Sequence, residues 1–444
     1  MKNKLLLAFF VLVASTLIAQ EVPSSFSMDE ALEWGMNYNR TLQRASMELQ
    51  KAHKEKWKTI SIGFPQINAT MQYQNNIEQP VSLVPAQFFG GNEGEFAELI
   101  FGTQQTAMAN VELSQLLFDG TYIVGVQGIK HYISTAENVL EKTQIEVKKA
   151  IITAYINVLV ARENNQILSR NAQTVQKNIT EVEQLVANGF AEEENVEQLR
   201  LTLARLTTQI RFAKKATLLA ENVLKLLLGI NLEEDPKLTD GLSALTARHL
   251  LETTPTDDYN NNIDIRLAED NVVSEKLLYR LERAKGLPSF SAFINGNYMG
   301  NSNNFTFTQR DQKWFGAAAF GVRIRVPIFS SLGRSAGSQK AKLSLQQAET
   351  QLIETRSKIF VDWQNARNNY AFAKENHQTA KDNLALAQRI ASKNTTKFFE
   401  GLSSSFDLRQ AQLQLYEAQQ SFIQSMREVI LEKTNLTTII NTKE

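Results

Sequence analysis

The chain contains the same plan twice, and this internal duplication limits its possible folds more than any other feature. Three groups of residues recur in the same order: Gly63-Phe64-Pro65 with Gly286-Leu287-Pro288, Leu116-Leu117-Phe118 with Pro327-Ile328-Phe329, and Asn188-Gly189-Phe190 with Glu400-Gly401-Leu402. Asn195 and Asp407 each follow the glycine of the last group by six residues. A period of about 210 residues is far longer than a solenoid repeat, so the sequence predicts two fused copies of one large unit.

The boundaries of the two copies follow from breaks in the pattern. We place the first copy at 21–228 and the second at 263–444, with an equatorial connector at 229–262 where prolines and glycines interrupt the helical pattern. Residues 1–20 begin with Met1-Lys2-Asn3-Lys4, which carries two positive charges, and continue as a short apolar run. This composition predicts a secretory signal peptide that is removed, so we expect the mature chain to lie outside the cytosol.

Composition excludes several kinds of chemistry. The chain has no cysteine, so it holds neither a disulfide nor a Cys-ligated metal. Its formal net charge is +0 at pH 7, whereas a nucleic-acid partner requires a basic face. The 4 histidines are scattered, and no catalytic constellation stands out. We therefore expect no enzyme activity, no cofactor, no metal site and no nucleic-acid partner.

Each copy predicts a pair of strands after an opening helix. Residues 28–62 are rich in Ala, Leu, Glu, Lys and Gln, which predicts one long helix that Pro65 ends. Alternation of apolar and polar residues predicts strands at about 66–76 and 109–118, separated by a polar loop that contains several glycines. The second copy predicts strands at about 289–299 and 315–329. In the last strand the apolar residues share one face, and Arg323 and Arg325 share the other.

Strands of this kind suit a membrane. Segments of about ten alternating residues with aromatic side chains near their ends are typical of a transmembrane β-barrel wall. The same alternation also fits a sheet of a soluble protein with one face on a core, and periodicity alone does not separate the two.

The helices after the strands predict two long hairpins, at about 121–228 and 334–440. Apolar residues recur at steps of four and three, as in a coiled coil, from Val147 to Val186 and again from Ile359 to Phe398. Gly189 and Gly401 mark the tips, because glycine tolerates the backbone conformation that ends a helix. The outgoing helix would span on the order of 100 Å, which only an elongated assembly can use.

Two strands per copy give four strands per chain, too few to close a sheet in lipid. Open edges would leave backbone amides unsatisfied in hydrocarbon, so chains must pool their strands. Two chains would give about eight strands and an interior filled by side chains, whereas three would give about twelve and room for an aqueous lumen. A function in transport would therefore favour a homotrimer.

In the order, duplication and spacing of these motifs, the whole mature chain resembles the TolC family of bacterial outer-membrane efflux proteins. The resemblance implies a mainly α fold with a transmembrane β part, in which a trimeric 12-stranded barrel with four strands per chain continues as a periplasmic α-helical barrel. It implies an exit duct of a tripartite efflux pump or type I secretion system, in contact with outer-membrane lipid. A periplasmic adaptor and an inner-membrane transporter would be its partners.

The resemblance also implies a constriction at the periplasmic end, where family members often carry acidic rings. Asp407 matches such a position, and the next acidic position falls on Gln410, so one ring is missing. Asn195 and Gln198 are the equivalent residues of the first copy. Three copies of Asp407 around one axis would attract cations. Alternatively, Asp407 caps the returning helix, and both roles can hold together.

Other candidate residues lie at the tips and in the last strand. The resemblance implies adaptor docking at the two tips, which comprise Gly189, Phe190, Ala191, Gly401, Leu402 and Ser403. Arg323 and Arg325 either line the barrel lumen or extend to a membrane interface. A periplasmic coiled-coil adaptor or scaffold is the alternative function, because adaptors also use long helical hairpins. The cargo, whether a drug, a metal ion or a secreted protein, does not follow from the sequence.

Overall fold

The computed structural model describes residues 23–251 and 258–440, which form two compact units. The helical unit comprises Asn138–Leu267 with the segments up to Glu48 and from Glu354 onward. The strand unit comprises Leu49–Glu137 and Ala268–Ile353. The expected signal peptide, residues 1–20, lies outside the described residues. Within 23–251 and 258–440, no helix is both long and apolar enough to cross a membrane.

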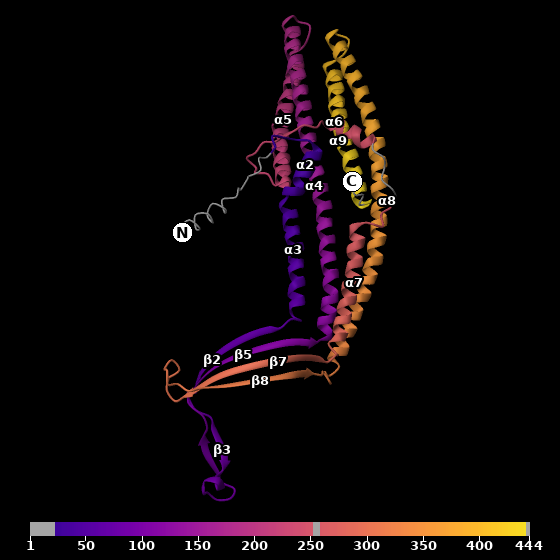
Figure 1. Cartoon of the computed structure of the whole chain (residues 1–444). Helices are drawn as coiled ribbons and strands as arrows, with labels where there is room; N and C mark the ends of the chain where they lie inside the picture. The colour runs from indigo at the N-terminus through magenta and orange to yellow at the C-terminus, as the bar shows by residue number, and fades with distance from the viewer. Residues whose placement is uncertain (1–22, 252–257, 441–444) are drawn as a thin grey trace, which may run out of the picture. The chain divides into compact units, whose positions relative to one another are not determined.

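Two helical hairpins dominate the helical unit (Figure 1). The first hairpin is formed by α4 (Gly120–Ala187) and α5 (Glu193–Leu228), and the second by α8 (Gly333–Phe399) and α9 (Ser405–Ile440). All members of the two predicted apolar seams are buried or half-buried. Ile151 and Val158 of the first seam have no exposed surface. Burial of this apolar stripe, rather than helix propensity, stabilises helices of such length.

The opening helix differs from its prediction, because it is two helices. The first, α2 (Met28–Tyr38), ends at Asn39, and α3 (Arg40–Ser61) begins directly after it. The Asn39 side-chain oxygen accepts from the backbone N–H groups of Thr41 and Leu42 at 2.8 and 3.2 Å, which caps the new helix. Its amide donates to the Leu227 carbonyl at 2.6 Å. A tertiary contact with the end of α5 therefore sets the break.

The expected connector contains regular structure. A short strand, β6 (Lys237–Leu238), pairs in parallel with β1 (Ser25–Phe26), and α6 (Leu242–Leu251) follows. Leu242 and Leu245 of α6 are buried in the same core cluster as Ile430 of α9. Part of this segment thus packs into the helical unit. The helix α7 (Ile263–Ala284) comes next and leads toward the second pair of strands.

Four antiparallel strands form the sheet of the strand unit, in the order β2-β5-β7-β8 (Figure 1). They are β2 (Gln66–Asn75), β5 (Gln105–Phe118), β7 (Ser289–Ser302) and β8 (Trp314–Arg325). The last strand ends at Arg325, not near 329. Pro327 has no backbone N–H for a ladder bond, which suits it to a position beyond the strand.

The expected loop between the first two strands carries a β-hairpin. Here β3 (Val81–Pro85) pairs with β4 (Phe96–Ile100), and a short 3₁₀-helix, η1 (Ala86–Phe89), lies between them. Many of its apolar side chains are exposed in the single chain, among them Leu83 and Phe88. The predicted polar loop therefore contains regular structure over this segment.

Candidate functional site

The strand register separates apolar from polar residues on the two faces of the sheet. Residues directly opposite each other on neighbouring strands share a face. On one face these rows are Ile67-Leu113-Ile294-Phe320, Ala69-Val111-Gly296-Ala318, Met71-Ala109-Tyr298-Gly316 and Tyr73-Ala107-Gly300-Trp314. We call this surface the apolar face. None of its sixteen residues is charged.

Rows on the opposite face are largely polar. They include Asn68-Glu112-Asn295-Ala319 and Thr70-Asn110-Asn297-Ala317. Arg323 and Arg325 lie on this polar face, opposite Ser291 and Ser289 of β7. The Arg323 guanidinium lies 5.1 Å from the ring centre of Phe293, which belongs to the same face. The two arginines therefore lie on the face opposite to the apolar rows, as the alternation predicts.

The apolar face is uncovered in the single chain. Met71 is 88% exposed and Phe320 is 87% exposed. A contiguous apolar surface of this extent marks an interaction with a partner or a membrane. Aromatic side chains gather at the end of the sheet where β7 turns into β8. The rings of Tyr298 and Trp314 stack at 5.4 Å, and Phe307 lies 6.1 Å from Trp314. Such a group is typical of the interface between lipid and water.

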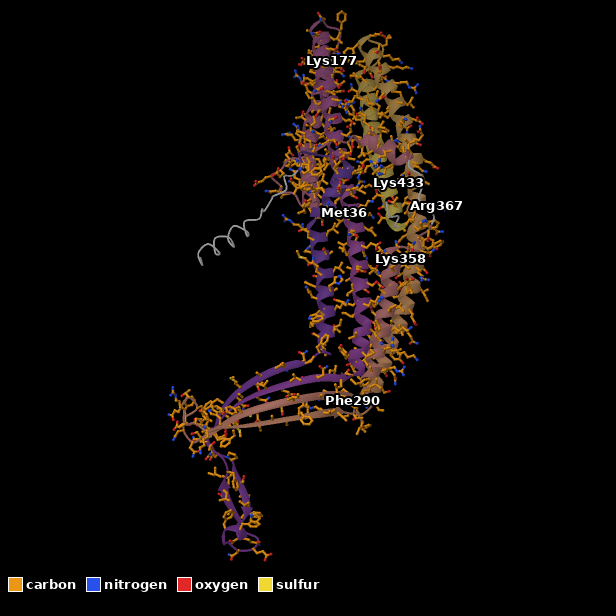
Figure 2. The ribbon with its side chains drawn as sticks, viewed as in Figure 1. Met36, Lys177, Phe290, Lys358, Arg367 and Lys433 are labelled. Atoms are coloured by element: carbon orange, nitrogen blue, oxygen red, sulfur yellow. The ribbon has the colours of Figure 1, made fainter. Side chains whose placement is uncertain are left out.

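Phe290 marks the opposite end of β7 (Figure 2). Its ring centre lies 5.8 Å from that of Phe118, next to the register shift between Leu116 and Phe118. Aromatic pairs therefore occur near both ends of the apolar face.

The tips of the two hairpins have the same backbone conformation and a similar pattern of exposed residues. Gly189 and Gly401 have φ values of +74° and +75°, a conformation that glycine adopts without strain. Phe190 and Leu402, which follow them, are exposed. Ala191 and Ser403 are half-buried. The two tips thus each present a glycine followed by one exposed apolar side chain.

Asp407 forms a capping box at the start of α9. The Asp407 carboxylate accepts from the Ser404 backbone N–H at 3.2 Å and from the Ser404 hydroxyl at 2.7 Å. In return, the Asp407 N–H donates to the Ser404 hydroxyl at 3.2 Å. The hydrogen bonds from Ser404 lower the pKa of the Asp407 carboxyl below 3.8. The predicted cap is therefore present, and the carboxylate remains exposed to solvent.

The two hairpins are linked close to Asp407. Arg409 Nη1 donates to Gln198 Oε1, which joins α9 to α5. Gln198 also donates to Glu194 at 2.8 Å. The Arg409 guanidinium lies 5.5 Å from the ring centre of Phe406. Gln198 is thus tied to the second hairpin, while Asn195 is half-buried and Gln410 is exposed.

Comparison with known proteins finds a matching family model and similar chains. Residues 257–442 match the family model described as outer membrane efflux protein. TtgC, a probable efflux pump outer membrane protein of Pseudomonas putida, is 22% identical over 419 residues, which cover 92% of this chain and 82% of TtgC. ArpC, an antibiotic efflux pump outer membrane protein of Pseudomonas putida, matches with the same identity and coverage.

Solved structures have folds similar to that of this chain. CusC superposes with a TM-score of 0.73 at 17% identity, covering 96% of this chain and 95% of CusC. VceC from Vibrio cholerae has a TM-score of 0.72 at 15% identity, covering 93% of this chain and 95% of VceC. Residues 257–442 thus match the outer membrane efflux protein family, and the chain as a whole has the TolC-like fold. The resemblance and the TolC-like fold class predicted from the sequence are therefore confirmed.

In this TolC-like chain the structure adds one site residue that the sequence analysis missed, Arg409. Its signal was weak, because an arginine near a helix start is usually just a solvated residue. Only the contact with Gln198 separates it from the many other cations of the helices. In the described part of the chain, no group of three or more His, Cys, Asp and Glu side chains is placed to hold a metal ion.

Proposed function

We propose that this chain is the outer-membrane exit duct of a tripartite efflux pump or type I secretion system, and conducts substrates without chemistry. The observation that carries this proposal is the separation of the two faces of the sheet. An apolar face on all four strands would contact outer-membrane lipid, and the polar face with Arg323 and Arg325 would line a water-filled lumen. The helical hairpins would extend the duct into the periplasm.

A homotrimer follows from the open edges of the sheet. In the order β2-β5-β7-β8, the outer edges of β2 and β8 lack a partner strand within the described chain. Each unpaired amide in hydrocarbon costs several kcal/mol, so β8 of one copy would pair with β2 of the next. Three copies give about twelve strands, enough to leave an aqueous interior.

The tips of the hairpins supply the constriction and the docking surface in this proposal. Three Asp407 carboxylates around the axis would attract cations, and Gln410, Asn195 and Gln198 would complete a polar rim. The exposed residues Phe190 and Leu402, which follow the tip glycines, would contact a periplasmic adaptor. The adaptor would in turn hold the inner-membrane transporter. A periplasmic scaffold, the alternative function, would leave the apolar face in water.

Two neighbouring residues of β7 test the proposal. Ile294 lies in an apolar row and Asn295 in a polar row, so a new arginine at either position tests one face. Ile294→Arg would place the charge in lipid, at a cost of roughly 2–4 kcal/mol at the bilayer midplane, and should reduce the yield of outer-membrane trimer. Asn295→Arg should still assemble and should alter single-channel conductance in planar bilayers.

The two variants provide each other's control, because they differ only in the face that carries the charge. If both assemble equally well, or if the unaltered protein passes no current, the exit duct is the wrong function.

A further inference from the structure

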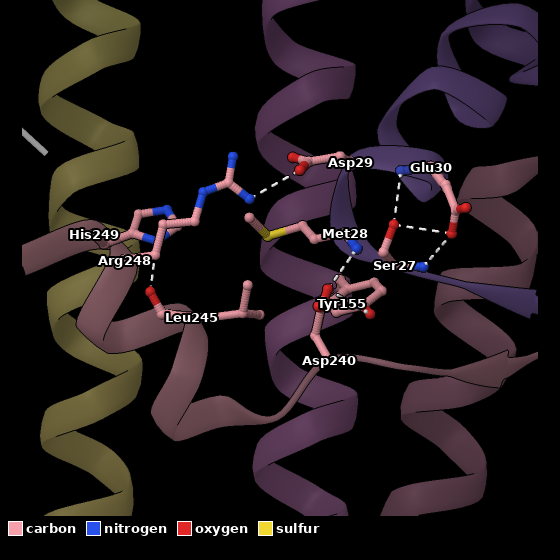
Figure 3. Close-up of polar contacts among 9 residues, drawn as sticks. All are labelled: Ser27, Met28, Asp29, Glu30, Tyr155, Asp240, Leu245, Arg248 and His249. Atoms are coloured by element: carbon pink, nitrogen blue, oxygen red, sulfur yellow. Dashed lines mark hydrogen bonds and ion pairs between the residues drawn. The ribbon is translucent and has the colours of Figure 1, made fainter. Parts of the chain in front are cut away.

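The helical unit contains a cavity of about 310 Å³ where α2, α4, α6 and α9 meet. We call it the basic cavity. Figure 3 shows part of its wall, with Met28 and Asp29 facing Arg248 and His249. None of these residues belongs to the sheet faces or to the hairpin tips described above. The volume is at the lower end of the range of small-molecule sites in proteins.

A hydrogen-bond network fixes one wall of the basic cavity. The Met28 backbone N–H donates to the Asp240 carboxylate at 2.7 Å, and the Tyr155 hydroxyl lies 3.1 Å from the same carboxylate (Figure 3). Ser27 and Glu30 form a capping box at the start of α2, which holds the first turn. This wall is therefore formed before any ligand arrives, which lowers the entropic cost of binding.

Cations outnumber anions around the basic cavity. Among the described residues, Lys148, Lys149, Arg248 and Lys433 line it, and Asp29 is the single acidic residue of the lining. Asp29 is paired with Arg248 at 2.8 Å. The chain as a whole has a formal net charge of +0, so this local excess of positive charge does not reflect the average composition. Like charges gathered around one cavity favour an anion within it.

Lys433 is the most buried of these cations. It lies on α9 (Figure 2), is 3% exposed, and its ammonium donates to the His249 carbonyl at 3.2 Å. The Tyr370 hydroxyl donates to the same carbonyl at 3.1 Å. His249 Nδ1 lies 2.9 Å from the Leu245 carbonyl, which can only accept, so that nitrogen carries a proton. The His249 carbonyl therefore holds the charged end of Lys433 in a fixed position at the inner end of the basic cavity.

Apolar side chains provide the rest of the wall. Met28, Leu32, Ile145 and Ile152 line the basic cavity beside the cations. Thr434 donates its hydroxyl to the Ile430 carbonyl of its own helix, so this proton is not offered to a ligand. Lys149 also lines a neighbouring cavity, whose wall includes Glu146 and Asp362. Lys148 lines the basic cavity but not this neighbouring cavity.

We propose that the basic cavity binds a small amphipathic organic anion, whose carboxylate or phosphate lies on Lys148, Arg248 and Lys433. Its short apolar body would lie on Met28 and Ile152. A charged group contacted by such donors is held by charge-assisted hydrogen bonds, while the apolar part gains from leaving water. The residues of this site are separate from the sheet faces and the hairpin tips, so its test does not depend on whether the chain forms a channel.

Acetylation footprinting tests the proposal at single lysines. The full chain in phosphatidylcholine nanodiscs is treated briefly with acetic anhydride, and mass spectrometry measures modification of Lys148 and Lys177. Lys177 lies on the same helix, is exposed, and does not line the basic cavity (Figure 2). Saturating octanoate or octyl phosphate should slow acetylation of Lys148 about tenfold, the effect of one charge-assisted hydrogen bond. Lys177 should react at an unchanged rate.

Variants and further probes make the outcome decisive. Arg248→Gln should weaken octanoate binding about tenfold, and Lys358→Gln, at an exposed lysine of α8, should leave it unchanged. Equal protection of Lys148 and Lys177, protection by octyltrimethylammonium, or no protection would overturn the anion site. Protection by acetate as strong as by octanoate would overturn the apolar part. Protection only in phosphatidylglycerol nanodiscs would replace the free anion with a lipid.

Discussion

Replacing Tyr155 with phenylalanine should loosen the attachment of the first described residues to the helical unit. The Tyr155 side chain has no exposed surface, and its hydroxyl lies 3.0 Å from the Phe26 carbonyl and 3.1 Å from the Asp240 carboxylate. Burial first, and then the Asp240 charge, raises the pKa of the phenol. The group is therefore protonated at neutral pH and can donate.

The size of the effect follows from the partners that lose a donor. The hydroxyl has one proton and two acceptors, so it gives one strong hydrogen bond or a shared one. A hydrogen bond to a charged group contributes about 1.5–3 kcal/mol, and the Asp240 carboxylate keeps its bond from the Met28 N–H. Tyr155→Phe should therefore lower the free energy of local opening by about 1–3 kcal/mol, roughly a 5- to 150-fold change in opening equilibrium.

Hydrogen exchange measures this opening directly. The amide of Lys237, which donates to the Ser24 carbonyl, and that of Thr239, which donates to the Phe26 carbonyl, should exchange faster by the stated factor. Tyr416→Phe is the matched control. The Tyr416 hydroxyl is buried without a hydrogen-bond partner among the described residues, so its removal should leave stability unchanged or raise it. Unchanged exchange in Tyr155→Phe, or equal losses in both variants, would refute the reasoning.

Three other outcomes are expected. Arg409→Gln should break the link to Gln198, and higher channel open probability in planar bilayers would show it; traces identical to those of the unaltered protein would contradict it. Asp407→Asn should reduce cation preference while leaving α9 capped, and an unchanged reversal potential in a salt gradient would exclude the charged ring. Burial raises the pKa of Tyr416 to about 12, so between pH 10 and 12 the unfolded chain ionises this phenol before the folded one does, and the free energy of unfolding falls over that range. Thermal unfolding of Tyr416→Phe should lack this part of the alkaline loss, and parallel curves for the two proteins would count against it.

The sequence predicts helices and strands most reliably where the burial of one face of the element produces the periodicity of its side chains. The seams from Val147 and Ile359 follow the helical period because one stripe of each helix must leave water. The alternation in β2 and β8 follows the period of a strand, and the register aligns these alternating sets into rows. The existence of these helices and strands depends on local pattern alone, so the duplicated pattern predicted two hairpins and two pairs of strands.

Features that depend on contacts between distant segments were not predicted. Asn39 breaks the opening helix because its side chain bonds to Leu227, far away in sequence. Gly229 fits the same junction, since a Cβ there would lie 2.3 Å from the Tyr38 carbonyl oxygen. No periodicity encodes such a contact. The β3–β4 hairpin was missed for a different reason, because its short strands lie between prolines and glycines that favour a loop.

The two roles considered for Asp407 depend on each other. A carboxylate in a cation-attracting ring must stay ionised although two like charges approach it in a trimer, and such neighbours raise its pKa. The hydrogen bonds from Ser404 act in the opposite direction and lower that pKa. The equivalent turn of the first hairpin begins at Glu192 without a side-chain cap, and Asn195 occupies the position of the carboxylate. The duplicated unit therefore places a capped, ionised side chain at the second tip alone, so a trimer would carry three such charges and not six.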